Sequence, residues 1–182
     1  YGAVTWGQFF VYQGFNEKTG WMHTSTGTDI IDEFEETIID GSQGLQYVYG
    51  TEKRKVETIP VKLSYKTDTG MGQNTYEVYR THHGPITQSN GDKWVATAMM
   101  WDPIKALQQS FIRTKQNDHQ GFRKMMDMRT NSSNNTVFAD ASGNIAYYHG
   151  NFIPKRNDTL DYTLPVDGSN PLTDWQGLHE VD

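Results

Sequence analysis

Residues 93–112 read KWVATAMMWDPIKALQQSFI, and within this stretch the hydrophobic pattern changes from that of a strand to that of a helix. The apolar run 93–101 follows a turn signal at residues 90–92 and predicts a strand. Asp102 followed by Pro103 is typical of a helix N-cap and the first helical position. Beyond this pair, apolar side chains recur at helical spacing, at Ile104, Leu107, Phe111 and Ile112. The sequence therefore predicts that a strand gives way to a helix at residue 102.

Upstream of this point the sequence predicts strands alone. Short runs rich in aromatic and β-branched residues alternate with Gly, Asn and Asp, a composition that favours strands and turns. Pro60 indicates an edge or a bulge in the strand that contains it. The expected strands are 8–15 and 21–26, which would form a hairpin, then 33–39, 45–49, 53–65 and 76–81.

Downstream, the sequence predicts one more helix and one more hairpin. Residues 136–140 and 144–149 predict the hairpin, and residues 154–182 predict a loop-rich segment. The second helix should place on one face the residues Phe122, Met125 and Met126. Strands followed by helices and a final hairpin make an α+β pattern. We expect one fragment over 1–182, with mainly strands over 1–101, helices over 102–130, and the hairpin and loops over 131–182.

Composition argues against several classes of function. The 182 residues carry a net charge of −6, whereas nucleic acids attract basic surfaces. There is neither a long apolar run nor a basic amphipathic helix, so no membrane contact is expected. The sequence has no cysteine, which excludes disulfides, thiolate metal sites and a cysteine nucleophile. Because Tyr1 is not a natural start and no stop signal precedes Asp182, we expect both ends to be cut.

The segment Asp29-Ile30-Ile31-Asp32 offers two carboxylates with a backbone carbonyl between them. Calcium takes six to eight oxygen ligands and often mixes carboxylates with carbonyls. A loop aspartate that caps backbone amides has the same pattern, and on these residues alone that simpler interpretation is favoured.

Three further groups of polar residues are weaker candidates. His82 and His83 would point to opposite faces of a strand, so we expect one core and one exposed histidine. Without cysteine or a His-Glu-x-x-His motif, no zinc site is expected. Thr24-Ser25-Thr26 lacks the Gly-x-Ser-x-Gly elbow of a serine nucleophile. The stretch from Asp140 to Asn144 predicts a plain hairpin turn.

A series of short motifs, in one order, spans nearly the whole chain. These motifs are Gly14-Phe15-Asn16, Gly20-Trp21, Thr-x-x-Gly-x-Asp-x-x-Asp over residues 24–32, Thr81-His82-His83-Gly84-Pro85, residues 135–148, Pro154-Lys155-Arg156, Leu164-Pro165-Val166 and Asp174-Trp175-Gln176-Gly177. Each motif is degenerate, but the ordered set resembles the β-chain of the penicillin acylase family, whose members are N-terminal nucleophile hydrolases.

This resemblance implies a β-rich partial αββα sandwich with two short helices and antiparallel strands. In the family a precursor is cut so that a serine becomes the first residue of the β-chain. The α-amine of that serine serves as base, through water, and its hydroxyl attacks an amide carbonyl. The resemblance implies that this serine lies upstream of Tyr1 and that the asparagine of the oxyanion hole lies beyond Asp182. Residues 1–182 alone are then expected to be inactive.

The resemblance also assigns roles to particular residues. By motif, Ser25 matches the residue whose backbone N–H supplies half of the oxyanion hole. Asp29 and Asp32 match carboxylate ligands of a structural calcium site, Ile31 matches the carbonyl ligand between them, and Tyr162 matches a further carbonyl ligand. The resemblance thus reverses the interpretation of the two aspartates and leaves the double histidine structural.

The expected function is hydrolysis of N-acyl amide bonds by the full-length protein, with penicillins, acyl-homoserine lactones or other N-acyl compounds as substrates. Met22 stands where the family usually has glycine, and we expect it to crowd the turn beside the oxyanion position. Thr136 stands where a pocket aromatic can occur, which puts a phenylacetyl pocket in doubt. One rival is a non-catalytic, calcium-stabilised, β-rich binding or scaffold module. Another is an acylase relative that has lost activity.

The resemblance implies partners and a location as well. The partners are the missing α-chain, the remaining β-chain segments and a small N-acyl substrate, and the location is periplasmic or extracellular. An excised segment should leave strands without neighbours, and we expect 8–15 and 45–49 to be those strands. Residues 1–182 in isolation are therefore expected to self-associate.

Overall fold

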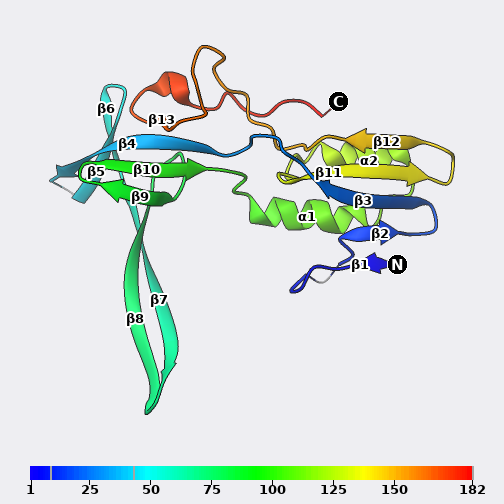
Figure 1. The fold of residues 1–182 in the computed structure, drawn as a ribbon, viewed down its shortest axis with the longest axis horizontal. Helices are drawn as coiled ribbons and strands as arrows, with labels where there is room; N and C mark the ends of the chain where they lie inside the picture. The colour runs from blue at the N-terminus through cyan, green and yellow to red at the C-terminus, as the bar shows by residue number, and fades with distance from the viewer. Residues whose placement is uncertain (9, 43, 182) are drawn as a thin grey trace. The chain divides into compact units, whose positions relative to one another are not determined.

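The computed structural model describes residues 1–8, 10–42 and 44–181. The chain forms two compact units, each assembled from stretches that are distant in sequence (Figure 1). Unit 1 contains Tyr1–Ile30, Met100–Lys155 and Gln176–Asp182. Unit 2 contains Ile31–Met99 and Arg156–Trp175.

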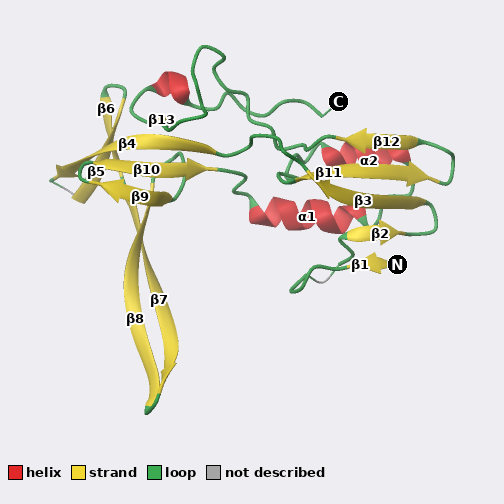
Figure 2. Ribbon diagram, in the orientation of Figure 1, coloured by secondary structure: helices red, strands yellow, loops and turns green. Residues whose placement is uncertain are grey.

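Unit 1 is an antiparallel five-stranded sheet with two helices on one face (Figure 2). The strand order is β1-β2-β3-β11-β12. Trp21 and Phe138 are paired across β3 and β11, and Phe122 of α2 packs on them to form the core. The elements are β1 (Gly2–Ala3), β2 (Gln13–Phe15), β3 (Thr19–Ser25), α1 (Pro103–Arg113), α2 (His119–Met126), β11 (Asn134–Asp140) and β12 (Ile145–Tyr148).

Helix α1 begins where the sequence predicts, but the face that it buries is polar rather than apolar. The Asp102 carboxylate accepts a hydrogen bond from the Lys105 backbone N–H at 3.0 Å, which caps the helix before Pro103. The buried residues of α1 are Gln109 and Arg113, whereas its apolar side chains Ile104, Leu107, Phe111 and Ile112 are exposed. The apolar stripe of α1 is therefore a surface of unit 1.

The hairpin of β11 and β12 and its turn confirm the sequence interpretation. One carboxylate oxygen of Asp140 accepts hydrogen bonds from the backbone N–H groups of Ser142 and Asn144, at 2.9 and 3.0 Å. The other accepts from the Asn144 side chain at 2.9 Å, and these bonds lower the pKa of Asp140. Asp140 is thus a turn residue.

Unit 2 is a strand-built unit with a sheet order of β6-β5-β4-β10-β9, to which β13 adds beside β4 (Figure 2). Phe34 and Val166 contribute to one core cluster, and Ile38, Tyr47 and Val56 form a second. The elements are β4 (Asp32–Gly41), β5 (Gly44–Tyr49), β6 (Glu52–Lys55), β7 (Glu57–Thr67), β8 (Gly70–Arg80), β9 (Ile86–Asn90), β10 (Lys93–Ala98), β13 (Val166–Asp167) and the 3-10 turn η1 (Pro171–Thr173).

Strand β4 alternates strictly between buried and partly exposed residues over 32–39. Phe34 and Ile38 lie on the buried face, as their spacing requires. The same period of two places Asp32 and Glu36 on that face. Two carboxylates are therefore held inside unit 2 by the pattern that buries its apolar residues.

The segment 53–65 forms two strands instead of one. Val56 is buried and donates its backbone N–H to the carbonyl of Leu45 at 3.0 Å, which separates β6 from β7. Strands β7 and β8 then form a two-stranded ribbon that extends away from the larger sheet (Figure 1). Pro60 lies in this ribbon opposite Glu77, so its expected edge position is confirmed.

Two expectations about the N-terminal and central strands are wrong. Of residues 8–15, only Gln13–Phe15 form a strand, because the chain loops back to pair β1 with β2, and Phe9 lies outside the described residues. Strand β5, which covers the expected strand 45–49, has β4 and β6 on its two sides, and β2 lies between β1 and β3. The strands expected to lack neighbours are therefore paired.

The α+β class with antiparallel strands and two short helices is confirmed. None of the helices in the described ranges is long and apolar enough to cross a membrane.

Candidate functional site

Ser25 is the last residue of β3, and it lies opposite Asn134 of β11. The next residue, Thr26, donates its N–H toward β11, to the carbonyl of Ser133 at 3.1 Å. Because successive N–H groups of a strand point to opposite sides, the Ser25 N–H points away from β11. The N–H of His23, two residues earlier, points to that side and reaches the Gln13 side chain at 3.2 Å.

On the side of β3 that the Ser25 N–H faces, the pairing with β2 does not extend as far as Ser25. Among the described residues, β2 pairs with β3 only at Gly20 and Trp21. The Asn135 side-chain amide holds the Ser25 carbonyl at 3.1 Å. The end of β3 is thus fixed by β11, while its last N–H is aimed away from that partner.

Asp32 lies at the start of β4 and is almost completely buried. Its Oδ2 accepts hydrogen bonds from Arg156 Nε at 2.7 Å and Trp175 Nε1 at 2.5 Å. Its Oδ1 is buried and has no hydrogen-bond partner among the described residues. The Tyr162 ring centre lies 5.7 Å from the Arg156 guanidinium, and its hydroxyl donates to the Thr173 carbonyl at 2.9 Å. Unit 2 thus brings Asp32 and Tyr162 into one cluster.

The other expected calcium ligands lie on the connection between the two units. Asp29 belongs to unit 1, and Ile31, whose side chain is exposed, is the first residue of unit 2. The approach of the Asp29 carboxylate to Asp32 therefore stays a prediction.

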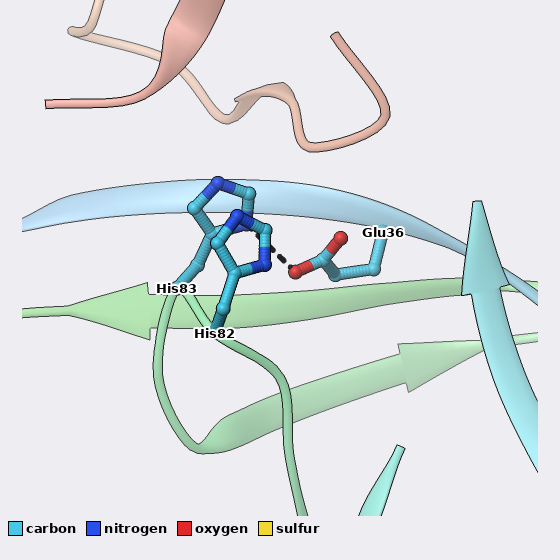
Figure 3. A group of neighbouring side chains, drawn as sticks. All are labelled: Glu36, His82 and His83. Carbon is cyan, nitrogen blue, oxygen red and sulfur yellow. Dashed lines mark hydrogen bonds and ion pairs between the residues drawn. The ribbon is translucent and has the colours of Figure 1, made fainter. Parts of the chain in front are cut away.

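His82 and His83 lie in a bend, because β8 ends at Arg80. Gly84, with φ of 153°, continues the bend, and a Cβ there would lie 2.0 Å from the Thr97 carbonyl oxygen of β10. The two imidazole rings project in the same direction, with centroids 3.8 Å apart (Figure 3). The expectation that they point to opposite faces is wrong, because it assumed a strand at this position.

The two histidines lie in a hydrogen-bonded cluster with the buried Glu36 (Figure 3). His83 Nδ1 lies 2.8 Å from Glu36 Oε1, which also accepts from the Thr81 hydroxyl at 2.6 Å. The other ring nitrogen of His83, Nε2, lies 2.9 Å from Asp174 Oδ1. Each of Glu36, His82 and His83 offers a possible metal-ligand atom, and these three atoms lie within 4.8 Å of one another.

Two tyrosines from β5 complete this cluster. The Tyr47 hydroxyl lies 3.0 Å from His82 Nδ1, and the Tyr49 hydroxyl donates to Asp174 Oδ2 at 2.5 Å. Burial, reinforced by the charge of His83, lowers the pKa of His82. Burial also opposes ionisation of Asp174, but hydrogen bonds from Tyr49 and His83 outweigh it and lower the pKa of that carboxyl.

The sequence did carry a signal for part of this cluster. Glu36 lies two residues from both Phe34 and Ile38, which strand periodicity assigns to the buried face. Asp174 lies in a stretch without regular structure of its own, so no local pattern predicts its approach to His83. The two tyrosines of β5 likewise read as ordinary strand residues.

Comparison with known proteins places the chain in a family. Its fold superposes on that of a thermostable penicillin G acylase from Alcaligenes faecalis with a TM-score of 0.79, over 97% of this chain and at 23% identity. The chain spans 32% of the length of that acylase chain. The penicillin amidase family model matches residues 1–182. The chain belongs to the penicillin amidase family, and the resemblance identified from its motifs is confirmed.

Proposed function

We propose that the full-length protein is an amidohydrolase that cleaves N-acyl amide bonds with an N-terminal serine nucleophile located outside residues 1–182. The observation that carries the proposal is the family match over the whole chain. The fold similarity to an acylase chain about three times as long supports a role as one segment of a larger enzyme. Penicillins, acyl-homoserine lactones and other N-acyl compounds are the candidate substrates.

Ser25 is proposed to contribute its backbone N–H to the oxyanion hole. Such donors act when they are fixed before the reaction and aimed at the developing negative charge. The pairing of β3 with β11 and the Asn135 hydrogen bond supply the fixation. The orientation of the Ser25 N–H away from β11 leaves it available for a ligand on that side.

Asp29, Ile31, Asp32 and Tyr162 are proposed as ligands of a structural calcium ion. The buried Asp32 Oδ1, which has no partner among the described residues, fits this role, because a buried carboxylate oxygen without a partner is costly. The all-oxygen donor set matches the preference of calcium. Bound calcium would supply fixed positive charge beside the buried Asp32 carboxylate.

The partners proposed for residues 1–182 are the remaining segments of the parent enzyme. The apolar stripe of α1 is exposed, and so are Phe15, Met22, Val137 and Tyr147 on the strands of the unit 1 sheet. Exposed apolar surfaces of this kind mark contact sites. In isolation, residues 1–182 should therefore form dimers by light scattering, and Phe111→Glu should reduce association. A monomer without apolar association would favour the scaffold alternative.

A periplasmic or extracellular location is proposed on the basis of family membership. The rival function is a non-catalytic, calcium-stabilised β-rich binding or scaffold module. Purified full-length protein should hydrolyse at least one chromogenic amide from a panel of acyl groups, and replacement of its N-terminal serine should abolish turnover. A full-length protein that folds, binds calcium and hydrolyses no member of the panel would support the module instead.

A further inference from the structure

The cluster around His82 and His83 has the construction of a metal site that is separate from the proposed calcium site. Asp174 Oδ1 lies 2.9 Å from His83 Nε2 and 3.7 Å from His82 Nε2. Ligand atoms bound tetrahedrally to zinc at its usual bond lengths are separated by ~3.3 Å. The two distances from Asp174 Oδ1 to the imidazole nitrogens are therefore near the separation that a small divalent cation requires.

Each of these three side chains is oriented by a hydrogen bond at its opposite atom. Tyr47 holds His82 Nδ1, Glu36 holds His83 Nδ1, and Tyr49 holds Asp174 Oδ2. Histidines that bind metals generally use their second ring nitrogen in this way, and a carboxylate partner makes the imidazole a stronger ligand. These hydrogen bonds leave the Nε2 atoms of the two histidines and Oδ1 of Asp174 as the atoms available to a metal ion.

The charges of the cluster also leave room for a cation. Both ring nitrogens of His83 lie within hydrogen-bond distance of carboxylate oxygens, Nδ1 of Glu36 Oε1 and Nε2 of Asp174 Oδ1. Glu36 is fully buried, and its Oε2 has no partner among the described residues. A divalent cation beside His83 would offset the charge of both carboxylates.

Solvent can complete the coordination. The His82 and Asp174 side chains are 30% and 32% exposed, whereas those of His83 and Glu36 are 6% and 0% exposed. The Glu36 side of the cluster is closed, and its Oε1 already accepts from Thr81 and His83. Water can therefore reach the cluster where His82 and Asp174 are exposed.

We propose that unit 2 binds one divalent transition-metal ion of the zinc class through His82 Nε2, His83 Nε2 and Asp174 Oδ1, with water completing the coordination. Imidazole nitrogen suits zinc, whereas calcium prefers oxygen ligands, so the two proposed sites select different ions. The bound ion would link the bend after β8 to the segment that follows η1.

The test is zinc binding by the full-length protein, freed of metals with a chelator and returned to a buffer with excess calcium. Calorimetric titration should show one zinc per chain, and cobalt(II) in its place should give the intense visible absorption of a tetrahedral site. His82→Gln and Asp174→Asn should weaken zinc binding by at least ~100-fold, and Tyr47→Phe by ~10–100-fold. His179→Gln, which alters an exposed histidine in unit 1, is the matched control and should leave the zinc affinity and the cobalt spectrum unchanged.

Absence of stoichiometric zinc binding by the wild-type protein in this buffer would overturn the proposal. Equal zinc affinity of the wild type, His82→Gln and Asp174→Asn would do the same. If either ligand variant fails to fold, Tyr47→Phe decides, because an unchanged zinc affinity and cobalt spectrum in that variant would also contradict the site.

Discussion

Replacing Ser25 by proline should abolish most of the amide hydrolysis of the full-length enzyme, whereas alanine at the same position should leave it intact. Proline has no backbone N–H, so the substitution removes the proposed oxyanion donor and nothing else that β11 needs. Thr26 makes its hydrogen bond to β11 on the opposite side. Thr24 is already extended, as the residue before a proline must be.

The size of the effect follows from the role of the donor. Loss of one oxyanion-hole hydrogen bond typically lowers kcat by about 10²–10³, or ~2.7–4 kcal/mol of transition-state stabilisation. The effect should fall on kcat and leave KM nearly unchanged, because the N–H acts on charge that develops in the transition state. Ser25→Ala retains the N–H and should differ from wild type by ~2-fold or less.

The assay is steady-state hydrolysis of a chromogenic N-acyl amide, with circular dichroism and thermal unfolding to confirm that both variants fold. A folded Ser25→Pro enzyme with kcat within ~3-fold of wild type would refute the assignment of the N–H. A large loss of activity in Ser25→Ala would instead show that the hydroxyl carries the function, contrary to the reasoning.

Three further predictions concern the full-length protein. Phe122→Ala, which empties the centre of the unit 1 core, should cost about 3–5 kcal/mol of unfolding free energy by denaturant titration, and Lys124→Ala on the exposed face of α2 less than ~0.5 kcal/mol. Calcium should raise the melting temperature of wild type, and Asp29→Ala or Asp32→Ala should lose that response; an unchanged response would contradict the calcium assignment. Burial, with the nearby charge of Arg113, lowers the pKa of His23 to about 4, so the unfolded state binds more protons between pH 4 and 6.5. Stability should therefore fall as pH drops from 6.5 to 4, by on the order of 2 kcal/mol after allowing for partial solvent exposure, and His23→Gln should flatten this part of the profile.

Local signals in the sequence predicted elements whose ends are set by local chemistry. Asp102 and Pro103 start α1, and Asp140 closes the turn between β11 and β12, because a side chain within four residues satisfies the backbone in each case. The face that α1 presents could not be predicted in this way. Its buried Gln109 accepts hydrogen bonds from Thr130, which follows α2 in the sequence, and that long-range contact overrides the apolar stripe.

The residues of the candidate site likewise differ in how far the sequence could predict them. Ser25, Asp29 and Asp32 belong to one continuous motif, so the resemblance could assign them roles, which stay predictions. The cluster of Glu36, His83 and Asp174 joins residues 47 and 91 positions apart, and it depends on where β8 ends. The strand expected over 76–81 ends within one residue of β8, but the bend that follows, which turns both imidazole rings to one side (Figure 3), has no local signal in the sequence.

The ribbon of β7 and β8 offers a place in the chain where a peptide can be inserted. Its strands pair with each other over their full length, from Glu57 opposite Arg80 to Thr67 opposite Gly70, and Asp68 and Thr69 form its tip (Figure 1). The Tyr65 ring covers Gly72, so the ribbon contributes to its own packing near that tip. Tips of this kind accept inserted sequence readily. A peptide tag between Asp68 and Thr69 could therefore tether the protein to a solid support while both cores stay untouched.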